Sequence, residues 1–196
     1  MRIFTRQNLL PLLAGLGLFL NSCSGEKEKA EPIDAEGFRI YTIKAGEHDC
    51  DNEYKQVTTS AMHFSVIFDS SAVYQTIDPV NQYDINKLYG LADCNTAHHS
   101  NSARMGWRWV NNQLEIHAYV YKNGKRNEDL ITAVPIGQPV KMSIEMLDST
   151  YIFKVGDKFT ELARGCSGQG TGYKLYPYFG GDETAPHEIK VKVKDL

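Results

Sequence analysis

The clearest alternation of apolar and polar positions lies between Ala103 and Tyr121. It predicts a β-hairpin whose two-residue turn is Asn111-Asn112, because asparagine tolerates the positive φ angles of such turns. One face of this hairpin is apolar, and a shift of one residue would mix the two faces, so the pattern itself fixes the register. The apolar face consists of Trp109 opposite Leu114, Trp107 opposite Ile116, and Met105 opposite Ala118. We therefore predict that this face belongs to the core.

The opposite face of the hairpin carries side chains that a simple solvated face rarely combines. They are Arg108 opposite Glu115, Gly106 opposite His117, Arg104 opposite Tyr119, and then Tyr121. Solvated strand faces are usually rich in lysine, glutamate and threonine. Guanidinium, imidazole and phenol groups around a glycine gap indicate instead a face that binds a ligand. The alternative interpretation is that arginine and tyrosine simply pack along a solvated sheet.

Further along the chain, short alternating runs are separated by turn residues. Strands are predicted at 38–43, 62–68, 119–121, 130–134, 140–146, 151–155, 159–162, 173–179 and 189–194. Short strands at this spacing predict an all-β fold, an antiparallel β-sandwich or barrel. A helical turn or two is expected only near 81–91. It falls at the end of the stretch 69–90, which lacks clear alternation and is interpreted as a functional or packing loop.

The first 36 residues have no pattern of a folded domain. Arg2 and Arg6 precede an apolar run that is too short for a stable membrane span and that ends in Leu20-Asn21-Ser22-Cys23. This arrangement resembles the leader of bacterial lipoproteins, which implies a signal peptide at 1–22 and lipidation of Cys23. Residues 23–36 then form a flexible tether and residues 37–196 one domain. The alternative is an ordinary secretory signal in which the cysteine is incidental.

A lipidated Cys23 implies attachment to a membrane of the bacterial outer envelope, on its periplasmic or its cell-surface side. The whole chain has a net charge of −3, and without residues 1–22 it keeps 19 basic and 24 acidic residues, a net charge of −5. This balance argues against nucleic acid or an anionic membrane surface as the partner. A local basic groove for an acidic sugar remains compatible with it. The sequence does not indicate the oligomeric state.

Three segments resemble strands of alginate-lyase-like jelly rolls. They are SARMGWR at 102–108, EIHAY at 115–119 and YKLYPYFGG at 173–181. The counterparts in that group are a strand containing arginine, a strand ending in Ile-His and a late strand rich in tyrosine. Here Glu115 stands where glutamine is usual, the glutamate expected between the arginines is absent, and Leu175-Tyr176-Pro177 stands where Phe-Lys-Ala is expected. The resemblance implies a concanavalin A-like β-jelly roll, the fold of many lectins, carbohydrate-binding modules and polysaccharide lyases.

In such a fold the polar hairpin face would join alternate residues of 173–179 on one concave sheet. Aromatic rings can cover the C–H faces of sugars, while arginine, histidine and glutamate bond their hydroxyls. Arginine can also hold a uronate carboxylate through two parallel hydrogen bonds. The first hypothesis is therefore an envelope lipoprotein that binds an oligo- or polysaccharide. Its predicted binding residues are Arg104, Arg108, Glu115, His117, Tyr119, Tyr121, Lys174, Tyr176 and Tyr178.

Two other hypotheses use the same domain differently. In a lyase acting on an acidic polysaccharide, an arginine would neutralise the carboxylate, histidine or tyrosine would remove the adjacent proton, and tyrosine would protonate the leaving oxygen. The candidates for these roles are Arg104, His117, Tyr119 and Tyr176. A domain that recognises another envelope protein would instead show a broad apolar patch.

Three cysteines follow Cys23, in a compartment that permits disulfides. Cys94 and Cys166 both lie in loops just before strands of the predicted concave sheet, so we favour a disulfide between them. Cys50 could instead pair with Cys94.

No cofactor is predicted, and no spacing of residues reaches the strength of a metal motif. The acidic loops around His48 and around Asp182 could bind calcium through carboxylate oxygens, but solvated acidic turns explain them as well. His98 and His99 are not expected to bind one metal ion together, because neighbouring residues of an extended chain point apart. They are interpreted as part of a loop rim, and the alternative is that one of them lines a groove edge with Asn101.

Overall fold

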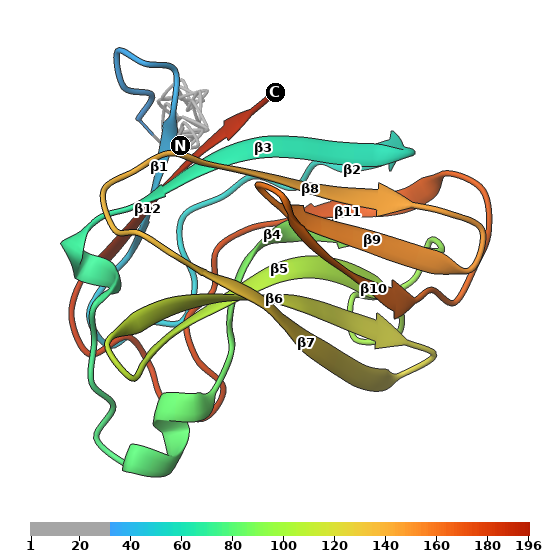
Figure 1. Ribbon diagram of the computed structural model, residues 1–196. Coiled ribbons are helices and arrows are strands. Elements are labelled where there is room, and N and C mark those ends of the chain that lie inside the picture. Colours follow the sequence, from blue (N-terminus) through green and yellow to red (C-terminus); the bar gives the residue numbers. More distant parts are fainter. Residues whose placement is uncertain (1–31) are drawn as a thin grey trace, which may run out of the picture.

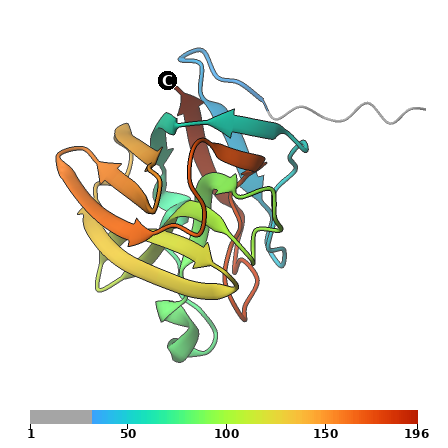
Figure 2. The ribbon, with the colours of Figure 1, turned by 90° about the vertical axis from the view of Figure 1, so that its right-hand side faces the viewer.

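The computed structural model describes residues 32–196 and contains two six-stranded antiparallel sheets that pack face to face (Figures 1 and 2). The first sheet has the order β1 (Arg39–Ile43), β12 (Ile189–Asp195), β3 (Ala61–Phe68), β8 (Val140–Met146), β9 (Thr150–Val155), β10 (Lys158–Ala163). The second sheet has the order β2 (Gln56–Thr59), β11 (Gly170–Leu175), β4 (Asn86–Ala92), β5 (Ser102–Val110), β6 (Gln113–Lys122), β7 (Lys125–Val134). This architecture confirms the prediction of an antiparallel β-sandwich.

The chain enters the fold at the outer strand of the first sheet. The amide of Ile40 donates to the carbonyl oxygen of Pro32 at 2.9 Å, and Lys192 of β12 pairs with Asp34 at 3.0 Å. Residues 32–36, which the sequence assigned to the tether, therefore contact the domain. The predicted signal peptide and Cys23 lie outside the described residues. Within 32–196, no helix has the length and apolar character needed to cross a membrane.

The β5–β6 hairpin forms in the predicted register. Val110 pairs with Gln113, and the pairing continues outward to Ser102 opposite Tyr121. Asn111 and Asn112 both have positive φ angles, of 52° and 58°, as a two-residue hairpin turn requires. The apolar face lies in the core between the sheets, where Trp107 and Ile116 are fully buried. The polar face points away from the first sheet, and we call it the outer face of the second sheet.

The helix expected near 81–91 is mostly wrong. A short 3-10 helix, η2, spans Pro79–Tyr83, and the rest of the segment forms the central strand β4. The register of β4 against β5 shifts between Lys87 and Tyr89, so that Leu88 and Tyr89 both lie in the core. This β-bulge breaks the alternation from which a strand would have been recognised.

The predicted face of the late tyrosine-rich strand is also wrong. In β11 Lys174 pairs with the core residue Leu91, so its side chain points between the sheets, where its Nζ lies 2.6 Å from the Tyr89 hydroxyl and 2.8 Å from Asp195. Tyr176 likewise packs inward, with its ring 5.7 Å from that of Tyr41. Lys174 and Tyr176 therefore do not line the outer face.

β11 ends before Pro177, which has no amide hydrogen to continue the ladder. Tyr178 then pairs with Lys87 of β4, and its side chain is on the outer face. The bulge in β4 and the proline opposite it together interrupt the inward–outward alternation of side chains between Lys174 and Tyr178. For this reason Tyr178 is on the predicted face while Tyr176, two residues earlier, is on the other.

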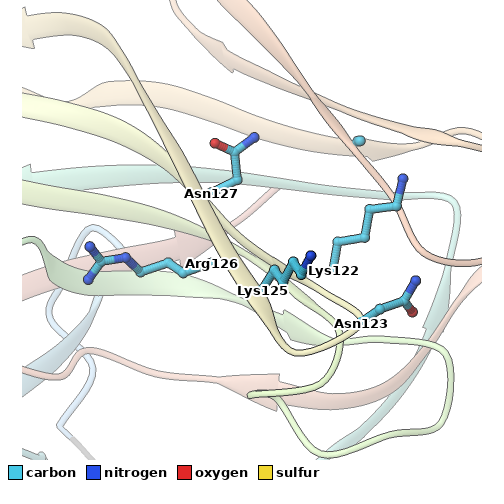
Figure 3. A pocket seen from close by; sticks show the side chains of 6 residues that line it. Lys122, Asn123, Lys125, Arg126 and Asn127 are labelled. Carbon is cyan, nitrogen blue, oxygen red and sulfur yellow. The ribbon is translucent and has the colours of Figure 1, made fainter.

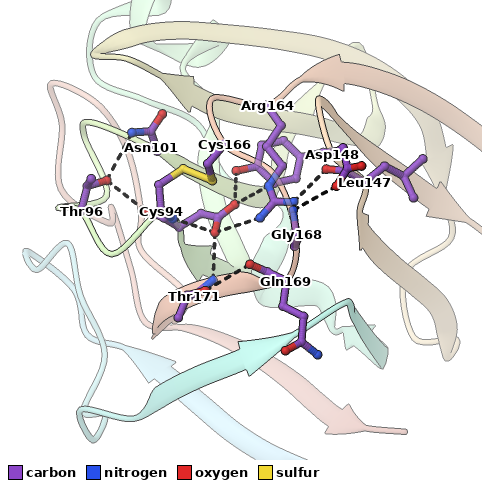
Figure 4. A network of polar contacts seen from close by, with 12 residues as sticks. Cys94, Thr96, Asn101, Leu147, Asp148, Arg164, Cys166, Gly168, Gln169 and Thr171 are labelled. Atoms are coloured by element: carbon purple, nitrogen blue, oxygen red, sulfur yellow. Dashed lines mark hydrogen bonds and ion pairs between the residues drawn. A yellow bond between two sulfur atoms is a disulfide. The ribbon is translucent and has the colours of Figure 1, made fainter.

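A buried carboxylate joins the two sheets at one end of the sandwich (Figure 4). Asp93 follows β4 and accepts hydrogen bonds from the side chains of Arg164 and Tyr151 and from the amides of Cys94 and Thr171. The side chains of Arg164 and Asp93 are both 0% exposed, and their Nε and Oδ2 atoms lie 2.7 Å apart. Arg164 also donates to the carbonyl oxygens of Leu147 and Gly168.

The predicted disulfide lies beside this carboxylate. Cys94 and Cys166 are bonded, with their Cα atoms 5.8 Å apart. The alternative pairing of Cys50 with Cys94 is therefore not formed. Cys50 is buried and its thiol lies 3.4 Å from the carbonyl oxygen of Pro177.

Replacing Arg164 with methionine should lower the free energy of unfolding by about 3–5 kcal/mol, because it leaves the Asp93 carboxylate buried without its counter-ion. Tyr151→Phe removes one hydrogen bond from the same carboxylate and should cost about 1–2 kcal/mol. Urea denaturation followed by circular dichroism measures both.

The matched control is Lys190→Met, because Lys190 forms an exposed pair with Glu188 and should contribute little. If Arg164→Met and Tyr151→Phe unfold at the same urea concentration as this control, the Asp93 network does not join the sheets energetically.

Candidate functional site

The polar residues of the outer face form two clusters along the strand direction. The first, the Arg104 cluster, consists of Lys87, His98, Arg104, Tyr119, Tyr173 and Tyr178. The second, the Arg108 cluster, consists of Tyr83, Arg108, Glu115 and His117. Of the residues predicted from the sequence, Arg104, Tyr119 and Tyr178 lie in the first cluster, and Arg108, Glu115 and His117 lie in the second. Tyr121 adjoins the first cluster on β6, where its ring is 6.0 Å from that of Tyr119.

Arg104 is a buried cation without a carboxylate partner. It is only 6% exposed, its Nε has no hydrogen-bond partner, and its guanidinium makes no ion pair with any residue of the described part of the chain. Its guanidinium lies 5.4 Å from the centre of the Tyr119 ring. Burial lowers the pKa of Arg104, and the groups opposing this shift are tyrosines rather than acids. Because arginine stays protonated in proteins, the site contains an uncompensated positive charge.

Lys87, which the sequence analysis missed, adds a second cation. Its Nζ donates to the carbonyl oxygen of Gly180 at 2.7 Å and lies over the rings of Tyr119 and Tyr178, at 5.4 and 5.6 Å from their centres. Burial, and after it the neighbouring Arg104, lowers the pKa of Lys87 to about 8. Lys87 was missed because its strand was expected to be a helix or loop. Its position opposite Gly106 becomes visible only once β4 is paired with β5.

The pair His98 and Tyr173 was also missed as part of the site. The backbone amide of His98 donates to the Tyr173 hydroxyl at 3.2 Å, and Nδ1 of the same histidine lies 2.9 Å from that hydroxyl. Burial, then Arg104 and His99, lower the pKa of His98 to about 4. The imidazole is therefore neutral at neutral pH, and the phenol can donate to its Nδ1. Of the two interpretations of this loop, a rim or a groove edge, the second describes His98 better, because the loop brings it within the electrostatic range of Arg104.

Aromatic rings surround the two cations. Tyr178 stacks on His48, with ring centres 5.2 Å apart and planes inclined by 6°, and its side of the site is open to solvent. Tyr54 lies 5.6 Å from Tyr173 at the edge formed by β2. Such rings can cover the C–H faces of a sugar, while the cations bind its charged groups.

The Arg108 cluster is electrically balanced. Oε2 of Glu115 accepts from Nε of Arg108 at 2.7 Å and lies 3.1 Å from Nε2 of His117. Burial lowers the pKa of His117, although the hydrogen bond to Glu115 opposes this. His117 is only 4% exposed, and its Nε2 is engaged with Glu115.

The glycine gap predicted at Gly106 is filled. A Cβ atom at this position would collide with Cγ2 of Ile85, a buried residue that lies over Gly106 between the two clusters. Ile85 therefore separates the Arg104 cluster from the Arg108 cluster.

The four residues proposed for lyase chemistry do not meet. Tyr176 is on the inner face of its sheet, and His117 is bonded to Glu115 in the other cluster. Arg104 and Tyr119 are adjacent, so they are the part of the predicted set that the structure brings together. The residues that could replace the missing histidine and tyrosine beside Arg104 are His98 and Tyr173.

A basic hollow of about 290 Å³ lies at the turn between β6 and β7 (Figure 3). Its lining contains no acidic residue and consists of Lys122, Asn123, Lys125, Arg126, Asn127 and Ala163. The Arg126 side chain extends away from the other labelled side chains (Figure 3). Arg126 of β7 lies opposite Tyr121 of β6 in the strand register. The positive charge of Arg126 contributes to the lowered pKa of Lys87. Arg126 is itself paired with Glu128, which lies opposite Tyr119, so an acidic side chain stands between the Arg104 cluster and the lysines of the hairpin turn.

Among residues 32–196, one group has a geometry that could suit a metal ion, namely Asp93, Cys94 and Cys166. Both sulfur atoms are in the disulfide, and the carboxylate is paired with Arg164. This group therefore has no free thiolate for a metal. The calcium-binding loops suggested by the sequence stay a prediction.

No protein-family model matches this chain. No curated protein matches its sequence. Solved structures match its fold. The alginate lyase AlyC3 superposes with a TM-score of 0.59 at 12% sequence identity, over 86% of this chain and 77% of the lyase. The same lyase in complex with dimannuronate gives a TM-score of 0.54 at 13% identity, over 86% and 77% of the two chains.

A non-specific endo-β-1,3(4)-glucanase from family GH16 superposes with a TM-score of 0.54 at 11% identity, over 80% of this chain and 69% of the glucanase. At such low identity the likeness establishes the fold alone. The chain has the concanavalin A-like jelly-roll sandwich on which these enzymes are built.

Replacing either cation of the Arg104 cluster should not destabilise the protein. Lys87 has a lower pKa in the folded state than in the unfolded state, so its protonated form opposes folding at neutral pH. The wild-type protein should therefore gain stability as pH rises from about 7 to about 9, by about 0.5–1 kcal/mol after allowance for partial exposure. Lys87→Met should lack this gain, and Arg104→Met should be at least as stable as the wild type at pH 7.

Urea denaturation at the two pH values checks both statements. A loss of more than about 2 kcal/mol in either variant would mean that the cations are structural.

Proposed function

We propose that this protein is an envelope lipoprotein that binds an acidic polysaccharide on the outer face of its second sheet. The observation that carries the proposal is the buried guanidinium of Arg104, which has no carboxylate partner among residues 32–196. A buried charge without a partner is costly, and proteins rarely retain one without a function. A carboxylate or sulfate group of a ligand would supply the missing negative charge.

The second cation fits the same ligand. Lys87 lies close enough to Arg104 for each to disfavour the charge of the other, so an anion placed between them would be attracted by both. A guanidinium can hold a carboxylate through two parallel bonds, and an ammonium acts as a point charge beside it.

The rings around the cations favour a sugar over a small inorganic anion. Tyr119, Tyr173 and Tyr178 present aromatic surface on several sides of the charge, and Tyr178 is already stacked on His48. Stacking against sugar C–H groups and hydrogen bonding to sugar hydroxyls use both parts of a phenol. The basic hollow at the β6–β7 turn extends the positive surface, which favours a polymer with several acidic residues.

Attachment to the envelope is supported by the leader sequence. Arg2 and Arg6, the apolar run and Cys23 occur in the order typical of lipoproteins. We infer that acyl chains on Cys23 hold the domain at the membrane.

A lyase acting on the same acidic polysaccharide is the second candidate, and the His98–Tyr173 pair favours it. A neutral imidazole and a phenol lie within hydrogen-bonding distance beside an arginine. If Arg104 neutralised a uronate carboxylate, the adjacent C–H would become more acidic. A base could then remove its proton while an acid protonated the leaving glycosidic oxygen.

The test uses soluble protein comprising residues 24–196, which retains both sheets and the core. It is mixed with a panel of acidic and neutral polysaccharides, and binding is measured by retardation in gels that contain each glycan. We expect retardation by an acidic glycan and its loss in Arg104→Met. Lys190→Met, on the first sheet, is the control. Retardation by neutral glycans alone, or an Arg104→Met protein that binds as well as wild type, would contradict the proposal.

The same mixtures distinguish binding from cleavage. β-Elimination produces an unsaturated sugar whose ultraviolet absorbance rises with time. A rising signal that is lost in Tyr173→Phe would make the protein a lyase, whereas a steady signal with retardation would make it a binding protein. If no glycan is bound or cleaved, a protein partner in the envelope becomes the leading hypothesis.

The affinity for the acidic glycan should depend on pH through Lys87. Its pKa of about 8 means that it is mostly protonated at neutral pH and loses its charge as pH rises further. The glycan carboxylates remain ionised throughout. Affinity should therefore be constant below about pH 7 and fall by up to about tenfold above pH 8. Isothermal titration calorimetry should show this fall in the wild type and a uniformly weaker, pH-independent affinity in Lys87→Met.

A further inference from the structure

The Arg104 and Arg108 clusters lie on the same face of β5 but differ in their charge. Arg104 and Arg108 are four residues apart, so their Cα atoms are separated by about 13 Å, further than a single sugar ring extends. Ile85 lies between them, over Gly106. One sugar residue therefore cannot contact both clusters, and a chain long enough to reach both would place different residues on each.

The Arg108 cluster does not attract an anion as the Arg104 cluster does. The positive charge of Arg108 is paired with Glu115 at 2.7 Å, and burial lowers the pKa of His117, which disfavours a second positive charge there. A carboxylate brought close to Glu115 would be repelled by its negative charge, which offsets the attraction to Arg108.

Hydroxyl groups fit this cluster better. Arg108 and His117 both bond to Oε2 of Glu115, so its Oε1 remains available as an acceptor. Nε and Nη1 of Arg108 are engaged, which leaves Nη2 available as a donor. The two side chains are 13% and 20% exposed, so a ligand can reach them. A sugar hydroxyl both donates and accepts, and neighbouring hydroxyls can use these two atoms together.

An exposed ring completes the cluster. Tyr83 is 58% exposed, and its ring centre lies 5.8 Å from the guanidinium carbon of Arg108. It can stack on the C–H face of a sugar whose hydroxyls reach Arg108 and Glu115.

The turn that carries Tyr83 is held in place. The carboxylate of Glu183 accepts from the amides of Ile77 and Asp78 and from the side chain of Asn81. Nη1 of Arg108 donates to the carbonyl oxygen of Tyr83 at 2.9 Å. The backbone that carries Tyr83 therefore loses little freedom on binding, which favours affinity.

We propose that the Arg108 cluster is a subsite for a neutral sugar, and that the ligand is a mixed glycan in which neutral residues stand beside acidic ones. The acidic residues occupy the Arg104 cluster and the basic surface towards the β6–β7 turn, and a neutral residue occupies the other end. This inference rests on the proposed function, because it uses the Arg104 cluster as the anchor of the acidic residue.

The test compares three glycans of equal length by isothermal titration calorimetry with residues 24–196. They are a uronic acid homopolymer, a polymer in which uronic acid alternates with a neutral sugar, and a neutral homopolymer. The alternating polymer should bind about tenfold more tightly than the uronic acid homopolymer. Tyr83→Ala should remove this advantage while leaving the affinity for the uronic acid homopolymer unchanged. Val80→Ala, at an exposed position of the same turn, is the matched control and should change neither affinity.

The outcomes separate this inference from the proposed function. Equal affinity for the two acidic polymers, unaffected by Tyr83→Ala, overturns the neutral subsite while the acidic-glycan proposal stands. Failure to bind either acidic polymer overturns both. Glu115→Gln provides a second check. It keeps the shape of the side chain but removes its charge, so it should weaken discrimination against the uronic acid homopolymer by raising the affinity for that polymer.

Discussion

The carboxylate of Asp93 is the constraint on which the arrangement of the two sheets depends. Apolar contact between sheets is not directional, so it can hold layers together without fixing where they meet. The hydrogen bonds of Asp93 are directional. They come from Tyr151 and Arg164 on the side of the first sheet, and from the amides of Cys94 and Thr171 on the side of the second. A buried ion pair stabilises a fold only when its remaining hydrogen-bonding positions are satisfied. Here they are satisfied, and the adjacent disulfide ties the same two loops covalently.

A frame fixed in this way allows the outer face to hold unfavourable charges. Arg104 and Lys87 each oppose the charge of the other and are largely removed from water. Such an arrangement costs folding free energy, as functional sites often do. Along β5 the charge changes from balanced at Arg108 to positive at Arg104, and beyond it the β6–β7 turn carries lysines next to the Arg126–Glu128 ion pair. The face therefore has a polarity along the strand direction, which gives a bound chain two distinguishable ends.

The sequence predicted features that local patterns indicate, such as strand alternation and the character of loops, and it missed features that depend on how distant strands pair. The β5–β6 register followed from strict alternation around Asn111-Asn112, and the Cys94–Cys166 bridge followed from their similar loops. The strand β4 was missed because its bulge places Leu88 and Tyr89 on the same side. Lys174 was assigned to the wrong face because strand alternation does not reveal which face of β11 meets the core.

The residues that meet on the outer face were also predicted only in part. Arg104, Tyr119 and Tyr178 were expected together on one face, and they are. Lys87 was not expected there, and His98 was considered only as an alternative at a groove edge, because no local pattern shows that β4 and a loop of 97–101 approach Arg104. Tyr176 was expected and is absent from the face, since Pro177 and the bulge opposite it interrupt the alternation. The lipid attachment at Cys23 stays a prediction, because the described residues begin at 32.

The turn at 32–37 affects how the domain would be oriented relative to a membrane that holds Cys23. Asp34 pairs with Lys192 of β12, so residue 32 lies at the edge of the first sheet, whereas the Arg104 and Arg108 clusters belong to the second (Figure 1). The eight residues 24–31 can extend at most about 30 Å from this point. A protein anchored through Cys23 would thus stand on its first-sheet edge, close to the bilayer, with the Arg104 and Arg108 clusters on the opposite layer. The polysaccharide of the proposed function could then cross that layer without competing with the lipid surface for space.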